Sequence, residues 1–398
     1  MNFWERRSSI ELISAAAGVG ALIVCAIAWF FDPYHALRGY LFAWLVMLGI
    51  ALGSMCVVML HILTGGEWGW PVRKPAEAAG MTLPALLILF IPLALGLRHI
   101  YPWADAGAVA ESSVLRHRQI FFGVWKVLLR VLIYFALWIF WAWRLRSLSD
   151  RLDETGDPIV SAKLRFWSGS GFVMYFATMS LAAMDLIASR EVDWYSSTFG
   201  LLTVTGQSLT AVAFLIVVLA LLREAPGLKE IVEPDRVHDL GNLLLTTVVL
   251  WSYIEFAEFL VIWMGNEQED NLWFYHRTHR GWGWVGLAII LLHFAFPFVL
   301  LLFQKIKRSL PLLAYVAAAV LGMRIIQVLW MVAPSNSGSQ PRVVSWLDPI
   351  ALIGVAGVWF ACFLWVLSRR PLAPSVLGRA GEELSPNEQD TGTSRSLA

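Results

Sequence analysis

Two carboxylates inside an apolar run are the residues of this sequence best suited to chemistry. Glu255 and Glu258 lie in the stretch 242–266, which is otherwise apolar enough for a membrane helix. A spacing of three residues places them about 60° apart on one face of a helix. A carboxylate at that depth costs roughly 2.5–3.5 kcal/mol on insertion scales, so it should face protein or water. We therefore expect a site of proton transfer around these two side chains.

The same helix face carries further polar groups, which leaves a structural alternative open. Thr247, Trp251 and Ser252 fall on the side of the two glutamates and extend them into a polar stripe. The alternative is that the carboxylates only pair with Arg324 or with an arginine of a neighbouring loop.

Other ionisable residues also lie within apolar runs, and their charges balance. Lys126, Arg130 and Arg324 supply three positive charges, against Asp185 and the two glutamates. Unpaired buried charges are costly, so the balance predicts pairing across helices. By depth, Glu258, Asp185, Lys126 and Arg324 are expected in the outer half, and Glu255, Arg130 and His293 near the middle. Asp185 could instead cap or pair near the outer interface, and Lys126 could extend outward to water.

Two histidines within the apolar runs, His61 and His293, could carry protons near neutral pH. His61 lies near the cytoplasmic end of its span, where a lone histidine is more often a hydrogen-bonded packing residue. A haem b site would need two facing histidines, and these two differ too much in depth.

The composition predicts an all-α polytopic membrane protein. The 398 residues are 58% hydrophobic and only 15% charged, and the mean hydropathy is +0.65. Windows of about 20 apolar residues mark ten membrane helices. They are expected at about 10–31, 39–63, 79–97, 120–143, 165–187, 199–222, 243–264, 283–304, 310–332 and 346–368. Spans two to five and six to nine could form two four-helix bundles, flanked by spans one and ten.

The distribution of basic residues predicts the orientation. Most of the lysines and arginines outside the spans lie on the side of the two termini, which the positive-inside rule places in the cytoplasm. We expect one multi-pass domain, residues 1–370, in the bacterial inner membrane, followed by a disordered polar tail, 371–398.

Composition and motifs also narrow the function classes. The net charge of +1 and the lack of a basic run argue against nucleic-acid binding. Cys25, Cys56 and Cys362 each stand alone, so no clustered thiols are available for haem c or an iron–sulfur cluster, and no metal site is expected.

A cluster of hydroxyl and amide side chains in span six is expected to hydrogen-bond between helices: Thr203, Thr205, Gln207, Ser208 and Thr210.

Several stretches together resemble a known family of membrane subunits. They are HILTGGEWGWPVRKPAEAAGMTLPALL (61–87), HIYPW (99–103), VDWYSSTFG (192–200) and YIEFAEFLVIWMGNEQEDNLWFYHR (253–277). As a set they resemble the NrfD-like membrane subunits of alternative complex III, a quinol:electron-acceptor oxidoreductase, and in particular the smaller, ActF-like ones. The similarity covers residues 10–368.

The resemblance implies a ten-helix subunit that acts inside a respiratory electron-transport complex. Its partners would be a sister NrfD-like subunit, a multihaem cytochrome c and an iron–sulfur subunit, which hold the haem c and the clusters. The complex would oxidise quinol and pass electrons to cytochrome c or an oxidase. The family's quinol site is usually attributed to the sister subunit, so this chain would bind no cofactor of its own, although quinol contact stays possible. Glu255, Glu258, Asp185, His293 and His61 are then candidates for a proton path, with Lys126, Arg130 and Arg324 as charge partners.

Two other functions fit the same residues. A stand-alone proton-coupled secondary transporter would use the buried charges for transport. A purely structural anchor would dock periplasmic subunits through the loops 98–119, 188–199 and 265–282.

Overall fold

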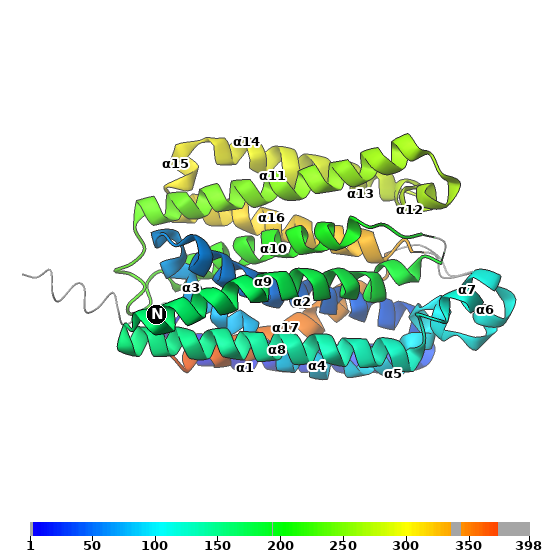
Figure 1. The fold of residues 1–398 in the computed structure, drawn as a ribbon, viewed down its shortest axis with the longest axis horizontal. Coiled ribbons are helices and arrows are strands. Elements are labelled where there is room, and N and C mark those ends of the chain that lie inside the picture. The colour runs from blue at the N-terminus through cyan, green and yellow to red at the C-terminus, as the bar shows by residue number, and fades with distance from the viewer. Residues whose placement is uncertain (1–2, 193, 336–343, 373–398) are drawn as a thin grey trace, which may run out of the picture.

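The structure is a computed structural model that describes residues 3–192, 194–335 and 344–372. Within these ranges the protein is helical and has no strand (Figure 1). Nine of the described helices are long and apolar enough to cross a membrane, and a bent helix pair brings the number to ten. The predicted all-α polytopic membrane fold is confirmed. The predicted tail lies outside the described residues from residue 373 on.

Eight of the predicted spans are single helices. They are α1 (Arg7–Phe31), α2 (Pro33–Thr64), α8 (Val124–Thr155), α9 (Pro158–Leu186), α10 (Phe199–Leu222), α11 (Pro234–Gly265), α16 (Leu310–Val332) and α17 (Leu347–Ser368). Local signals fix several of their ends. Asp32 and Asp157 each accept a hydrogen bond from a backbone N–H of the following helix, and each is followed by a proline in the first turn. Asn266 ends α11 in the left-handed conformation.

The two remaining spans are irregular. Span three consists of α4 (Leu83–Leu89) and α5 (Ile91–Ile100), with a bend of 57° between the segments Glu67–Leu89 and Ile91–Ile100. Pro92 in the first turn of α5 explains the break, because it lacks an N–H. Span eight contains α13 (Trp282–Ala288), the π-helix η4 (Ile289–Ala295) and α14 (Phe296–Leu302).

Short helices lie at both ends of the molecule. At one end are η2 (Pro102–Ala104), α6 (Ala106–Glu111), α7 (Ser113–Arg118), η3 (Ala188–Arg190) and α12 (Gln268–Thr278). At the other are η1 (Glu67–Gly69), α3 (Trp70–Gly80) and α15 (Gln304–Lys307). We call these ends the α12 face and the α15 face. The alternating helix directions bring the start of α1 and the end of α17 to the α15 face (Figure 1).

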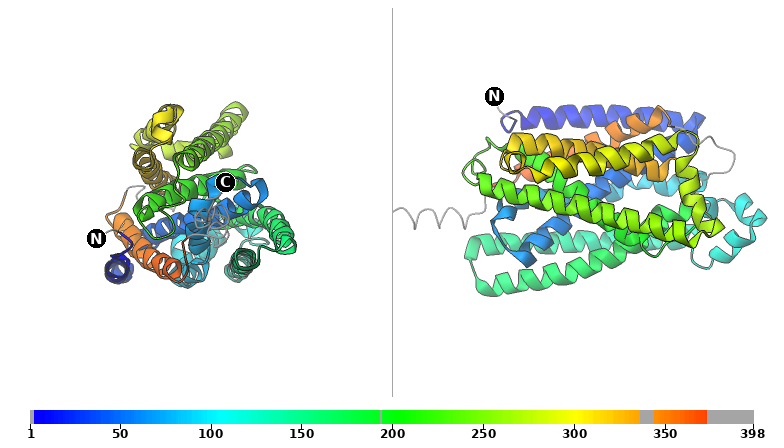
Figure 2. Two further views of the ribbon diagram at one scale, coloured as in Figure 1. Left: turned by 90° about the vertical axis from the view of Figure 1, so that its left-hand side faces the viewer. Right: turned by 90° about the horizontal axis from the view of Figure 1, so that it is seen from above.

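Helix α2 forms the centre of the molecule. Its most apolar 18-residue stretch is entirely buried, and it contacts α10, α17, α9 and α5. Helices α4, α5, α8 and α9 complete one bundle with α2, while α10, α11, α13–α14 and α16 form the second (Figure 2). Helix α1 lies against α17 at the side. The contacts follow the expected grouping of spans.

Candidate functional site

The carboxylate of Glu255 is linked to α16 through a neutral amide. Gln327 donates a hydrogen bond of 2.9 Å from Nε2 to Glu255 Oε2, and its Oε1 accepts a hydrogen bond from Arg324 Nη1. Gln327 is fully buried and Arg324 almost so, whereas Glu255 is half-buried. A spacing of three residues puts Arg324 and Gln327 on one face of α16. The expected partnership of Glu255 with Arg324 therefore runs through Gln327.

Glu258 has a different partner, one turn closer to the α12 face. It accepts a hydrogen bond from the hydroxyl of Thr198, which immediately precedes α10. Glu258 is 5% exposed, whereas Thr198 is exposed to solvent. Thr198 therefore connects this buried carboxylate to the water-accessible surface of the α12 face.

His293 lies inside the π-helix with no hydrogen bond to either ring nitrogen among the described residues. It is completely buried, and its ring lies 4.4 Å from that of Trp251. Trp251 Nε1 and Arg324 Nε likewise have no hydrogen-bond partner among those residues. A buried polar atom without a partner costs about 1–3 kcal/mol, and such groups usually bind ordered water. Isolated π-helical turns also occur frequently at functional sites.

On its other side, the Arg324 guanidinium packs against the backbone of α10. A Cβ on Gly206 would lie only 2.2 Å from Arg324 Nη2, so glycine permits this approach. Here a cavity of ≈20 Å³, large enough for one water molecule, separates α2, α10 and α16. Its lining combines apolar side chains with four polar ones: Thr203, Gln207, Thr210 and Arg324.

The polar groups continue from this cavity to α9. Gln207 Oε1 accepts a hydrogen bond of 2.7 Å from the hydroxyl of Tyr175. We call the series Tyr175, Gln207, Arg324, Gln327 and Glu255 the polar belt. It crosses the helix interior from α9 to α11.

The hydroxyl cluster of span six mostly bonds within its own helix. Thr203, Thr205 and Thr210 donate to carbonyls three or four residues earlier in α10, and Ser208 does so as well. Within the described part of the chain, only Gln207 and a 3.6 Å contact from Ser208 to Cys56 Sγ reach another helix. The prediction of hydrogen bonds between helices therefore holds for Gln207 and Ser208 and was wrong for the three threonines, because a hydroxyl in a helix readily reaches its own preceding turn.

Asp185 forms a separate ion pair between α8 and α9. Arg130 Nε and Nη2 donate to its two carboxylate oxygens at 2.8 and 2.7 Å, and the Tyr134 hydroxyl donates at 2.9 Å. This pairing agrees with the expected balance of buried charges. Arg130 also reaches the Phe121 carbonyl at 3.0 Å, so its guanidinium lies nearer the α12 face than its predicted mid-depth position.

Lys126 and His61 are also apart from the polar belt. Lys126 Nζ donates to the Gln119 and Ile120 carbonyls, both at 2.9 Å, and thus extends outward. His61, close to the α15 face, has Nε2 3.1 Å from the Gly66 carbonyl and stands against Trp68 and Trp70. The structure thus brings Glu255, Arg324 and His293 into one region, and it leaves Asp185, Lys126 and His61 outside it.

A buried ionic network at the α15 face was not predicted. Arg73 bonds Glu77 at 3.1 Å and Ser149 at 2.5 Å, and Lys74 bonds Asp153 at 2.6 Å. All five side chains are less than 10% exposed. Helix α3, which carries Arg73, Lys74 and Glu77, has the charge density of a loop. Only the i,i+4 spacing of Arg73 and Glu77 indicated a helix there.

Two arginines of the α12 face are buried rather than available for docking. Arg190 and Arg277 are both fully buried and donate to the Val332 and Met331 carbonyls at the end of α16. Cations at a helix C-terminus interact favourably with its dipole. These two residues of the predicted docking loops therefore hold α16 in place.

Comparison with known proteins adds no family assignment. No protein-family model matches the chain, and no curated protein matches it. Among the described residues, no three His, Cys, Asp or Glu side chains come together as metal ligands would. The likeness to NrfD-like subunits rests on the sequence motifs quoted above.

Proposed function

We propose that this chain is an integral membrane subunit of a quinol-oxidising respiratory complex and that it contributes a proton path through Glu255. The observation that carries the proposal is the link Glu255–Gln327–Arg324 in the helix interior. A half-buried carboxyl group held at this depth is costly to the fold, and such groups are usually functional.

In this proposal each residue has a distinct task. Glu255 takes up and releases the proton, Gln327 orients its carboxylate, and the positive charge of Arg324 stabilises the ionised form. Glu258 lies about 4.5 Å further along α11 and exchanges protons with the α12 face beside Thr198.

His293 and ordered water would carry protons between Glu255 and the side of the path away from the α12 face. A neutral imidazole can accept a proton at one nitrogen and release another from the second. Water bound to the unpartnered nitrogens of His293, Trp251 and Arg324 would connect this histidine to the polar belt. Asp185 and His61 remain predicted members of a longer path.

The resemblance to NrfD-like subunits supports the partners in the proposal. Electron transfer would take place in a multihaem cytochrome c and an iron–sulfur subunit, and quinol would bind chiefly at the sister subunit. The predicted orientation in the bacterial inner membrane puts the α15 face in the cytoplasm, with both termini. The α12 face would then meet the redox partners.

The stand-alone transporter is less well supported. Transporters built from two repeats often carry broken helices at matching positions of both halves. Here the bend at Pro92 is in the second span of the first bundle, whereas the π-helix is in the third span of the second. The two irregular spans do not correspond.

Co-purification tests the proposal. A tagged chain extracted from native membranes in a mild detergent should carry subunits with haem c absorbance and should reduce cytochrome c with quinol. The Glu255→Gln variant should retain the same partners and haem content, because the side chain lies inside the bundle rather than at a subunit surface. A chain that emerges alone, without haem, would contradict the proposal and favour the transporter.

A further inference from the structure

A basic pocket opens at the α15 face, outside the region proposed for proton transfer. Its volume is ≈340 Å³, and it lies between α8 and the residues that follow α17. The lining residues are Met81, Trp143, Arg146, Ser147, Asp150, Arg151, Glu154 and Arg370.

The cations of this pocket are incompletely neutralised. Arg370 pairs with Asp150, but the side chains of Arg146 and Arg151 make no hydrogen bond or ion pair among the described residues. Among charged groups, the Arg370 guanidinium acts most strongly on Arg146 and repels it, while Asp150 and Glu77 attract it. A pocket that holds two guanidinium groups close together is complementary to an anion.

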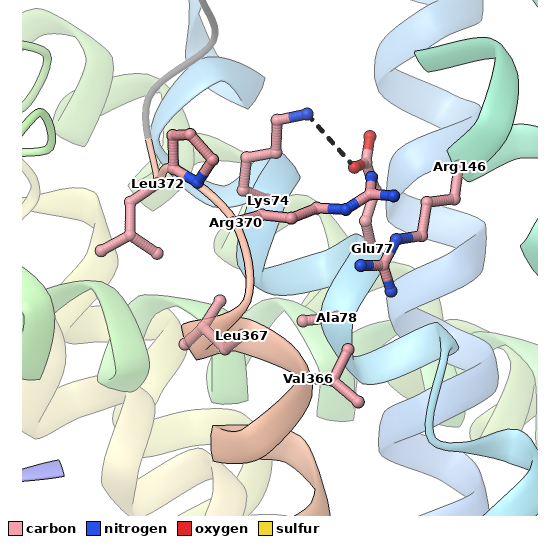
Figure 3. Close-up of a pocket in the computed structure, with 9 residues that line it drawn as sticks. Lys74, Glu77, Ala78, Arg146, Val366, Leu367, Arg370 and Leu372 are labelled. Carbon is pink, nitrogen blue, oxygen red and sulfur yellow. Dashed lines mark ion pairs between the residues drawn. The ribbon is translucent and has the colours of Figure 1, made fainter. Parts of the chain in front are cut away.

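The adjoining ionic network cannot supply that anion. Arg146 and Arg370 also line a smaller neighbouring cavity, together with Lys74 and Glu77 (Figure 3). There Lys74 lies 3.6 Å from Glu77 and 3.6 Å from Asp150, and Arg370 also pairs with Asp150, so the two acids that attract Arg146 already have cationic partners. The Arg146 side chain lines both the small cavity and the larger pocket.

An apolar surface leads along the helices to the pocket. Trp143 is 53% exposed and Phe140 43%, and their rings lie 6.4 Å apart on α8. Arg146 is three residues further on, about 4.5 Å closer to the α15 face. Tryptophan followed by arginine is typical of the level where a helix leaves the hydrocarbon core for the headgroup region.

We propose that this pocket binds the phosphate headgroup of an anionic phospholipid, with Arg146 and Arg151 as its principal ligands. The planar fork of an arginine matches phosphate oxygens. Basic pockets between membrane helices on the cytoplasmic side, where the predicted orientation places the α15 face, bind such headgroups. The acyl chains lie along Trp143 and Phe140. This exposed apolar track favours a lipid over a soluble phosphate compound.

The test is lipid titration of the purified, delipidated protein, followed by native mass spectrometry. Phosphatidylglycerol should bind at least tenfold more tightly than phosphatidylcholine. Arg146→Gln should weaken phosphatidylglycerol binding at least fivefold. Arg144→Gln is the matched control, because Arg144 is on the same helix at nearly the same depth but stacks on Trp167 at 5.3 Å. It should change the affinity less than twofold.

Three results would overturn the proposal. They are equal binding of the two lipids, equal effects of Arg146→Gln and Arg144→Gln, and competition by glycerol 3-phosphate at the same concentration as the lipid. The last would identify a soluble phosphate site. If Arg146→Gln does not yield monodisperse protein, Arg151→Gln replaces it, since Arg151 is exposed. It should weaken binding at least twofold, and an unchanged affinity would again contradict the site.

Discussion

At the scale of single residues, the main feature is a neutral amide between the half-buried Glu255 carboxylate and the buried Arg324 guanidinium. Gln327 holds Glu255 on one side and Arg324 on the other, so the cation stabilises the carboxylate without forming a direct ion pair with it. A direct pair would hold the carboxylate ionised more firmly. The intervening amide orients the Glu255 carboxylate and carries no charge itself, which is the role that the proposed proton path gives it.

Replacement of the amide should therefore affect both stability and function. Gln327→Leu removes two hydrogen bonds to charged groups, one of them to the buried Arg324, so we expect the free energy of unfolding to fall by about 2 kcal/mol. Thermal unfolding in detergent measures this loss. Gln304→Leu, at an exposed position of α15, is the control and should change stability by less than about 0.5 kcal/mol. Equal stability of the two variants would mean that Gln327 does not link the charges.

At the scale of helices, the site depends on the close approach of α2 and α10. A Cβ on Gly53 would lie 2.1 Å from the carbonyl oxygen of Gln207, so the two backbones touch where the polar belt crosses α10. Small residues at such contacts are typical of membrane helix interfaces. The contact fixes the height of Gln207 relative to the cavity and to Arg324.

Gly53→Ala tests this contact. We expect a loss of about 1–3 kcal/mol of stability, because α10 must move away from α2 and an overpacked core is strained. Gly322→Ala in α16 is the matched control, since no atom lies within 4 Å of its added Cβ. Alanine favours helix over glycine, so the control should be neutral or slightly more stable in thermal unfolding. A Gly53→Ala variant as stable as the control would contradict the close packing.

The helix scale also shows what the sequence could not predict. Windows of about 20 apolar residues located the ten spans, and the isolated charges Glu255, Arg324 and Asp185 identified helices with polar partners. The partners themselves depend on which helix faces meet, and no local pattern records this. Gln327 was missed for that reason, although a glutamine three residues after a buried arginine was an available signal. Helix α3 was missed because its buried charges resemble those of an exposed loop.

At the scale of the whole molecule, the alternating helices put the start of α1 and the end of α17 on one face. The excess of basic residues on that side predicts that it is cytoplasmic. The same reasoning would place α6, α7 and α12 on the opposite side of the membrane, together with Thr198 and its contact to Glu258.

Reporter fusions check this orientation. Alkaline phosphatase is active only outside the cytoplasm, so a fusion at Ala110 in α6 should be active. A fusion after Ser368 should be inactive, whereas green fluorescent protein at that position should fluoresce. The reverse pattern would place the α15 face outside and would remove the basis for a cytoplasmic lipid pocket.

The most direct test of the proposed proton path is proton uptake by the purified complex in liposomes during quinol oxidation. Glu255→Gln keeps the size of the side chain but cannot ionise, so it should lower the proton uptake per electron at least fivefold while haem content and detergent stability stay unchanged. Ser252→Ala, one turn earlier on α11, should retain the uptake of the unaltered protein, because among the described residues its hydroxyl bonds only the Val249 carbonyl. Unchanged proton uptake in the Glu255→Gln complex would contradict the central claim.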